Sequence, residues 1–186
     1  PVAVDVNGDG RADGVAWGDG TQARLLAAGC GLAPITVAIG AAAASAPVPA
    51  DRNRDGIPES LTVWADHRLR TLRLPGGESL WEFELKDQGQ YEPVLADCDG
   101  DGEPDAVVRG AEDVIGVSGK TGAKLWTVPN PGVRPSPVVA DLDGDGAAEL
   151  LTTGADEITA RSGRTGAVLW AARGFEFPMP PLVLDL

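Results

Sequence analysis

Four acidic stretches of one nine-residue pattern carry the clearest chemistry in this sequence. The last, DLDGDGAAE at residues 141–149, has carboxylates at positions 1, 3, 5 and 9 and glycine at position 6. Related stretches occupy residues 5–13, 51–59 and 97–105. Carboxylates held this close together repel one another unless a cation lies among them. The pattern therefore predicts a cation site that is repeated along the chain.

Calcium is the cation that fits this spacing best. Side chains at positions 1, 3 and 5 can converge on one point while glycine at position 6 permits a sharp turn. The carbonyl of residue 7 can then point inward, and the carboxylate at position 9 closes the shell. Calcium accepts six to eight oxygen ligands in flexible geometry, whereas magnesium requires a stricter octahedron. Zinc prefers histidine and cysteine, and the chain has one histidine and two cysteines.

The predicted sites hold up to four calcium ions, with the residue at position 7 contributing its main-chain carbonyl. The ligands of the first two loops are Asp5, Asn7, Asp9, Arg11, Asp13, Asp51, Asn53, Asp55, Ile57 and Glu59. Those of the third and fourth loops are Asp97, Asp99, Asp101, Glu103, Asp105, Asp141, Asp143, Asp145, Ala147 and Glu149. The second loop is the weakest, because arginines flank its asparagine. Asp185 matches the first ligand of a fifth loop.

The alternative is that these loops are acidic turns without a metal. Four copies in register favour the metal site. An EF-hand or dockerin site would need flanking helices and a bidentate glutamate at position 12. Here apolar, strand-like runs flank the loops, and position 12 is Ala16, Thr62, Val108 or Thr152. The EF-hand class is therefore excluded.

The net charge of −13 has a local origin in these loops. Positions 1, 3, 5 and 9 of the loops hold fourteen of the 28 acidic residues, and four calcium ions would bring the net charge to −5. Strong acidity disfavours nucleic acid and anionic membrane surfaces as partners. The sequence has no run of eighteen apolar residues, so we expect no membrane insertion. The chain begins inside a repeat at Pro1, and the lack of a visible signal peptide does not argue against secretion.

The loops recur with a period typical of repeat architectures. Their first aspartates lie at 5, 51, 97, 141 and 185, which are intervals of 46, 46, 44 and 44 residues. A short apolar strand that starts at a proline precedes each loop. Three more apolar runs follow it, at 60–64, 67–74 and 76–85 in the second repeat. In the first repeat the last of these strands is expected near Ile35.

Four short strands per repeat predict an all-β fold of β-propeller blades, each a four-stranded antiparallel sheet. The expected blades are 1–46, 47–92, 93–136 and 137–180, and 181–186 starts a fifth. A ring of four blades is rare, so we expect a single propeller region that is a fragment or half of a larger ring. Self-association of two copies would complete such a ring. An open fragment would expose an apolar sheet face at each end.

The Leu-Trp pairs that end three of the repeats, at 80–81, 125–126 and 169–170, are predicted to pack between blades. Ligand stacking is the less favoured role for these tryptophans. For Cys30 and Cys98, two unpaired buried thiols are favoured over a disulfide. His67 precedes Arg68, Arg70 and Arg73 in HRLRTLR. This stripe indicates a solvated outer strand, or else a patch for an anionic ligand.

The loops and leading strands resemble the FG-GAP/VCBS repeat family, the calcium-binding blades of propellers like those of integrin α-subunits. A remnant of the Gly-Ala-Pro trio of the family is present at 110–112 and 154–156, without its proline. GVSGKTGAKLW (116–126) and ARSGRTGAVLW (160–170) also resemble the tryptophan-docking motif of quinoprotein-type repeats, with serine where aspartate is usual. The resemblance implies calcium loops along one rim of a secreted or cell-surface propeller that binds proteins or glycans.

The preferred function is therefore a non-enzymatic one. The chain is predicted to be a calcium-stabilised extracellular or cell-surface module for protein or glycan recognition or adhesion, and a periplasmic location also fits. The alternative is part of a propeller-fold enzyme such as a polysaccharide lyase, since a fold does not fix a function. No catalytic pair stands apart from the loops in the sequence. A structural spacer in a repeat array is a third interpretation.

Overall fold

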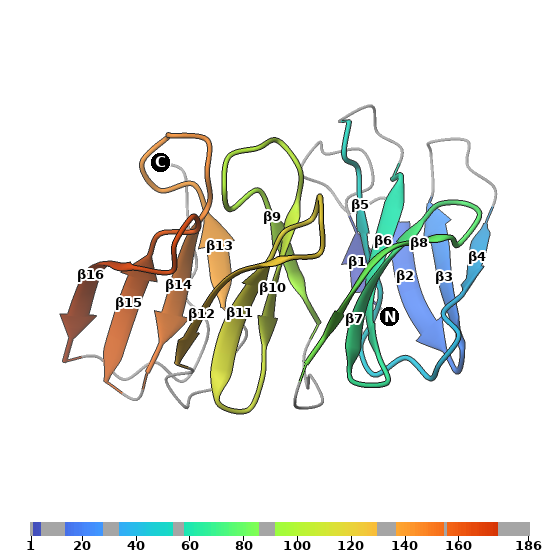
Figure 1. Ribbon diagram of the computed structural model, residues 1–186, viewed down its shortest axis with the longest axis horizontal. Helices are drawn as coiled ribbons and strands as arrows, with labels where there is room; N and C mark the ends of the chain where they lie inside the picture. Colours follow the sequence, from blue (N-terminus) through green and yellow to red (C-terminus); the bar gives the residue numbers. More distant parts are fainter. Residues whose placement is uncertain are drawn as a thin grey trace. The chain divides into compact units, whose positions relative to one another are not determined.

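The computed structural model of the chain describes residues 2–4, 14–27, 34–53, 58–85, 92–129, 137–154 and 156–174. Within these ranges, sixteen strands form four antiparallel sheets of four strands each (Figure 1). None of the described residues belongs to a helix that is long and apolar enough to cross a membrane. The predicted all-β class, built from four-stranded antiparallel sheets, is confirmed.

The chain divides into two compact units, and the first comprises Pro1–Pro93. Its two sheets have the strand orders β1-β2-β3-β4 and β5-β6-β7-β8, so each strand pairs with its neighbour in sequence. The strands are β1 (Val2–Val4), β2 (Gly14–Asp19), β3 (Gln22–Ala27), β4 (Ile35–Ala38), β5 (Val48–Ala50), β6 (Ser60–Ala65), β7 (Arg68–Arg73) and β8 (Ser79–Glu84).

The second unit comprises Val94–Leu186. Its sheets have the orders β9-β10-β11-β12 and β13-β14-β15-β16. The strands are β9 (Val94–Ala96), β10 (Asp105–Arg109), β11 (Asp113–Val117), β12 (Lys124–Pro129), β13 (Val138–Ala140), β14 (Glu149–Thr153), β15 (Glu157–Arg161) and β16 (Val168–Arg173). In both sheets an acidic loop joins the first strand to the second.

Proline and the pairing register define equivalent positions in the sheets. Strands β5, β9 and β13 each begin directly after a proline, which has no N–H to add to the ladder. On the fourth strands, Trp126 pairs with Gly116 and Trp170 pairs with Ala160. Ile35 on β4 pairs with Leu25 at the equivalent place. The expectation that Ile35 stands where the other repeats have tryptophan is therefore confirmed.

Apolar residues of adjacent sheets form the core of each unit. In the first unit, Leu25 and Val37 of one sheet cluster with Leu61 and Leu72 of the next. In the second, Trp126 and Val128 cluster with Leu150 of the following sheet, among others. Each sheet is thus apolar on a face that only its neighbour can cover.

The tryptophans at the ends of the repeats differ in burial. Trp81 is 8% exposed and Trp126 is 5% exposed, as predicted for core anchors. Trp170 is 46% exposed and its neighbour Leu169 is 52% exposed. The prediction of core packing is therefore wrong for Trp170 in this chain. The physical reason is that no described strand lies beyond β16 to cover the ring.

Candidate metal centre

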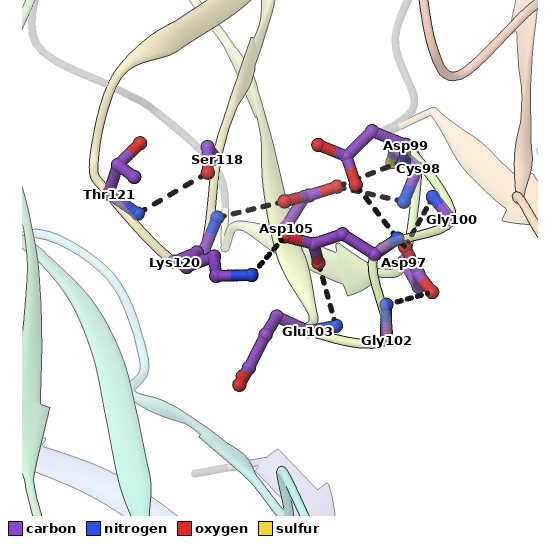
Figure 2. A network of polar contacts seen from close by, with 12 residues as sticks. Asp97, Cys98, Asp99, Gly100, Gly102, Glu103, Asp105, Ser118, Lys120 and Thr121 are labelled. Atoms are coloured by element: carbon purple, nitrogen blue, oxygen red, sulfur yellow. Dashed lines mark hydrogen bonds and ion pairs between the residues drawn. The ribbon is translucent and has the colours of Figure 1, made fainter.

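The third acidic loop, between β9 and β10, curls around the carboxylate of its first aspartate. Asp97 Oδ1 accepts hydrogen bonds from the main-chain nitrogens of Gly100 and Asp101, at 2.7 and 3.1 Å. Asp97 Oδ2 accepts a third from the nitrogen of Gly102 at 2.9 Å (Figure 2). Gly100 and Gly102 have φ of 79° and 88°, a left-handed conformation that glycine adopts without strain. The glycines therefore allow the loop to turn around Asp97.

The fourth loop, between β13 and β14, has the same construction. Asp141 Oδ1 accepts a hydrogen bond from the nitrogen of Gly144 at 2.7 Å, and Oδ2 accepts one from Gly146 at 3.0 Å. These glycines have φ of 79° and 86°. Asp143 Oδ1 in turn accepts from the nitrogen of Asp145 at 3.1 Å. Two loops with different sequences thus fold in one way.

Each of the two loops brings three carboxylates together. One group comprises Asp97, Asp99 and Asp101, and the other comprises Asp141, Asp143 and Glu149. In each group, one carboxylate oxygen per residue lies within 4.8 Å of the others. Because calcium–oxygen distances are about 2.3–2.6 Å, two ligands of one ion lie at most about 5 Å apart. Both groups therefore fit a calcium shell.

Position 9 differs between the two loops. Asp105 is 1% exposed and accepts hydrogen bonds from the main-chain nitrogens of Cys98, Asp99 and Gly119, at 2.9, 3.3 and 2.8 Å. Loss of hydration on burial raises the pKa of Asp105 to about 6, against the lowering effect of these hydrogen bonds. Its carboxylate joins strand β10 to the loop and to the turn after β11, and it is not part of the three-carboxylate group.

Glu149, one methylene longer, does belong to the group of its loop. Its Oε2 accepts a hydrogen bond from the nitrogen of Leu142 at 2.9 Å. Burial, followed by the nearby charges of Asp143, Asp145 and Asp141, raises the pKa of Glu149 above its ordinary value. A cation among these carboxylates would favour the charged form of Glu149 and so lower its pKa. Glu59 makes the matching contact in the second loop, where its Oε2 accepts from the nitrogen of Arg52 at 2.8 Å.

The remaining predicted ligands are less fully placed. Asp51, Asn53 and Glu59 of the second loop are described, whereas Asp55 and Ile57 lie outside the described residues. The whole first loop and the unfinished fifth loop also lie outside them, which includes Asp5, Asn7, Asp9, Arg11, Asp13 and Asp185. At position 7, the nitrogens of Glu103 and Ala147 donate to the Oδ1 atoms of Asp101 and Asp145, at 2.9 and 2.8 Å.

Two basic residues beside the loops are absent from the predicted site. Lys120 Nζ lies 3.3 Å from Asp101 Oδ2, and Arg164 Nη2 lies 3.6 Å from Asp145 Oδ2. Arg164 Nη1 also donates to the carbonyl of Asp99, so this arginine joins the two loops. Both residues occupy the variable position of the S-G-[KR]-T-G turn. This shared position is the sequence signal that could have pointed to the two basic residues. The sequence does not show, however, that the turn lies beside the acidic loop.

Arg68 and Arg70 of the basic stripe form ion pairs with the neighbouring strand. His67 lies in the turn before β7, with φ of 57°, and β7 is an inner strand, so the prediction of an outer strand is wrong. Arg68 pairs with Glu82 at 3.0 Å, and Arg70 pairs with the same carboxylate group at 3.6 Å. Glu84 on β8 also lies 4.0 Å from Arg68. Glu82 and Glu84 together thus balance the charges of Arg68 and Arg70, which disfavours an anionic-ligand patch.

Cys98 is a buried free thiol. Burial, together with the surrounding carboxylates, raises its pKa to about 12. Its main-chain N–H is one of the donors to Asp105. Cys98 therefore acts as a small apolar residue beneath the loop, whereas Cys30 lies outside the described residues.

Comparison with solved structures identifies the fold. The chain aligns with BamB from Moraxella catarrhalis with a TM-score of 0.63 and 18% identity, over 92% of this chain and 49% of BamB. It aligns with the dihydro-heme d1 dehydrogenase NirN, solved in complex with DHE, with a TM-score of 0.56 and 12% identity, over 83% of this chain and 33% of NirN. Both are β-propeller proteins. The chain is part of a β-propeller.

At these identities the likeness extends to the fold alone, and the propeller portion spans about half the length of BamB. No family model and no curated protein matches the chain. The resemblance to FG-GAP/VCBS repeats therefore stays a hypothesis that rests on the acidic loops, while the propeller architecture it implied is confirmed.

Proposed function

We propose that this propeller portion is a calcium-stabilised module that binds a protein or a glycan outside the cytosol. The observation that carries the proposal is the convergence of Asp141, Asp143 and Glu149, whose carboxylate oxygens lie within 4.8 Å of one another. The group formed by Asp97, Asp99 and Asp101 repeats this convergence in the neighbouring sheet. Two similar oxygen clusters on equivalent loops support a common ligand, and calcium has the matching chemistry.

The role of the metal follows from the place of the loops. Each loop joins the first two strands of a sheet, so an ion bound there would hold the two strands together. It would also offset the repulsion among carboxylates that already favours protonation of Glu149. Calcium sites of extracellular modules have dissociation constants of about 10⁻⁴–10⁻³ M. Sites of this strength would fill outside the cytosol, which agrees with an extracellular, cell-surface or periplasmic location.

Thermal unfolding with and without calcium tests the metal. At about 2 mM calcium, sites of this strength would each stabilise the fold by about 0.7–1.8 kcal/mol. We expect calcium to raise the Tm and EDTA to lower it. Asp141→Asn combined with Asp143→Asn should remove part of this shift, whereas Asp156→Asn, outside the loops, should leave it unchanged. A Tm that does not respond to calcium or EDTA would contradict the structural role of the metal.

A glycan array probed with the calcium-loaded chain tests the binding function. We expect calcium-dependent retention of a subset of glycans, or retention of a protein ligand in a matched protein array. An assay for cleavage of acidic polysaccharides by the same sample tests the enzymatic alternative. Cleavage there would contradict the non-enzymatic role and leave the metal proposal standing.

A further inference from the structure

The first and last sheets each have an apolar face that is exposed. On edge strand β16, Leu169 and Trp170 are 52% and 46% exposed. On the β1–β4 sheet, Val15 and Leu26 are 40% and 47% exposed, and they are direct cross-strand partners. Large apolar side chains that cluster on a sheet face indicate an interaction surface. Below, Leu169 and Trp170 are called the Trp170 face, and Val15 and Leu26 are called the Val15 face.

The second unit shows what covers a face like that of Trp170. Trp126 occupies the equivalent position on β12 and is 5% exposed. Its indole N–H donates to the carbonyl of Gly163 in the following sheet, and it clusters with Leu150 of that sheet. Leu150 is the residue of its own sheet that corresponds to Val15 by strand pairing. A tryptophan face of one sheet is therefore covered by a face of the Val15 kind on the next.

The first unit shows what covers a face like that of Val15. Leu61 and Leu72 are the equivalent cross-strand pair of the β5–β8 sheet, and they are 1% and 4% exposed. They cluster with residues of the preceding sheet, including Leu25 on β3. The face that packs on Leu61 and Leu72 includes Ile35, which occupies the position equivalent to that of Trp170. Within the described residues, neither exposed face is covered, and each is of the type that packs on the other between sheets of one unit.

We propose that two copies of this chain associate head to tail, with the Trp170 face of each copy packed on the Val15 face of the other. The same chain carries both complementary faces, and the interface would repeat the packing that already joins sheets within each unit. A head-to-tail interface of this kind uses two different faces, and each copy of the chain offers one of each. The proposal does not depend on calcium.

The oligomeric state and three matched variants test this pairing. Sedimentation velocity should give a mass of about twice 19.1 kDa for the unaltered chain, in both calcium and EDTA. Trp170→Asp and Val15→Asp should each give monomers, because each places a charge in both contacts of the pair. Thr127→Asp, an exposed position on β12, should leave the dimer intact. Circular dichroism checks that each variant is folded.

Mixing the two monomeric variants distinguishes head-to-tail contact from other modes. In a mixture, the intact Trp170 face of the Val15→Asp copy can still meet the intact Val15 face of the Trp170→Asp copy. We expect this mixture to recover a dimer, which unfolded variants could not do. The proposal is overturned if the unaltered chain is monomeric at all concentrations, or if Val15→Asp alone stays dimeric. Assemblies larger than a dimer would overturn the two-copy pairing.

Discussion

The indole nitrogen of Trp126 on β12 donates a hydrogen bond to the main-chain carbonyl of Gly163, which lies in the turn between β15 and β16 of the adjacent sheet. The ring lies so close to its own sheet that a Cβ at Gly116 would be 2.5 Å from it. On the other side, a Cβ at Gly166 would lie 3.3 Å from the ring. The tryptophan thus fills the space between two sheets and links them through one hydrogen bond.

Substitution of Trp126 separates the contribution of its packing from that of its hydrogen bond. Trp126→Phe keeps an aromatic ring but leaves the Gly163 carbonyl without this donor, and it should cost about 1–3 kcal/mol. Trp126→Ala also opens a cavity and should cost about 3–5 kcal/mol. Urea unfolding curves measure both losses. If Phe is tolerated as well as Trp, the hydrogen bond does not contribute to stability.

Gly163 should tolerate no larger residue. A Cβ there would lie 1.9 Å from the carbonyl oxygen of Ala148 and 2.8 Å from that of Cys98, both of them main-chain atoms that cannot move independently. We expect Gly163→Ala to cost at least about 3 kcal/mol, the upper end of ordinary overpacking. Gly110→Ala is the control, because the nearest atom to its Cβ would be 3.5 Å away. Equal stability of the two variants would show that the turn shifts freely.

Asp105 should be more important as a hydrogen-bond acceptor than as an acid. Asp105→Asn replaces one acceptor oxygen with an NH₂ group, which faces N–H donors of Cys98, Asp99 or Gly119. Leaving a buried donor unpaired costs about 1–3 kcal/mol, and we expect a loss of this size in EDTA, without any metal. Asp113→Asn, at an exposed position on β11, should change stability little. A loss that appears only in calcium would instead assign Asp105 to the metal shell.

Sequence reasoning predicted the sheets because their signals are local. A proline before each leading strand, glycines in each loop and short apolar runs are all readable within one repeat, and the strands lie close to those ranges. The place of Ile35 could be predicted for the same reason, since the repeat aligns it with tryptophan. In the third and fourth loops, six predicted ligands converge because alternating side chains of a tight turn can face one point: Asp97, Asp99, Asp101, Asp141, Asp143 and Glu149. Asp105 and Asp145 do not belong to these groups.

The differences arise where contacts join distant parts of the chain. Position 9 is acidic in every copy, but side-chain length and a donor from the next turn decide that Asp105 is buried and Glu149 joins its group. Lys120 and Arg164 meet the loops only because the hairpin turn folds back to the same edge of the sheet. Burial of a tryptophan depends on whether another sheet covers it, and no pattern within the repeat at β16 encodes that for Trp170.

The exposed pair of Glu157 and Arg173 gives a pH dependence of known sign. Arg173 Nε donates to Glu157 Oε2 at 2.5 Å, and this hydrogen bond lowers the pKa of Glu157 from its ordinary value of 4.5. A lowered pKa means that the pair stabilises the fold above pH 4.5 and that this contribution is lost as the pH falls through the lowered value. Glu157→Gln should therefore reduce the urea midpoint at neutral pH, and the difference should vanish in acid. Glu112→Gln, in an exposed turn, should show no such trend, and a difference that grows in acid would contradict the sign.

Lys120 should weaken calcium binding to the third loop, if the proposed sites bind calcium. Its ammonium group lies 3.3 Å from Asp101 Oδ2, so a bound ion would meet a positive charge on one of its own ligands. An exposed charge at this range contributes about 0.5–1 kcal/mol, and Lys120→Gln should tighten binding by about twofold to fivefold. Isothermal titration with calcium measures the change, and Lys124→Gln on the exposed side of β12 is the matched control. Weaker binding in Lys120→Gln would mean that the lysine orders the loop for the metal, the opposite of competition.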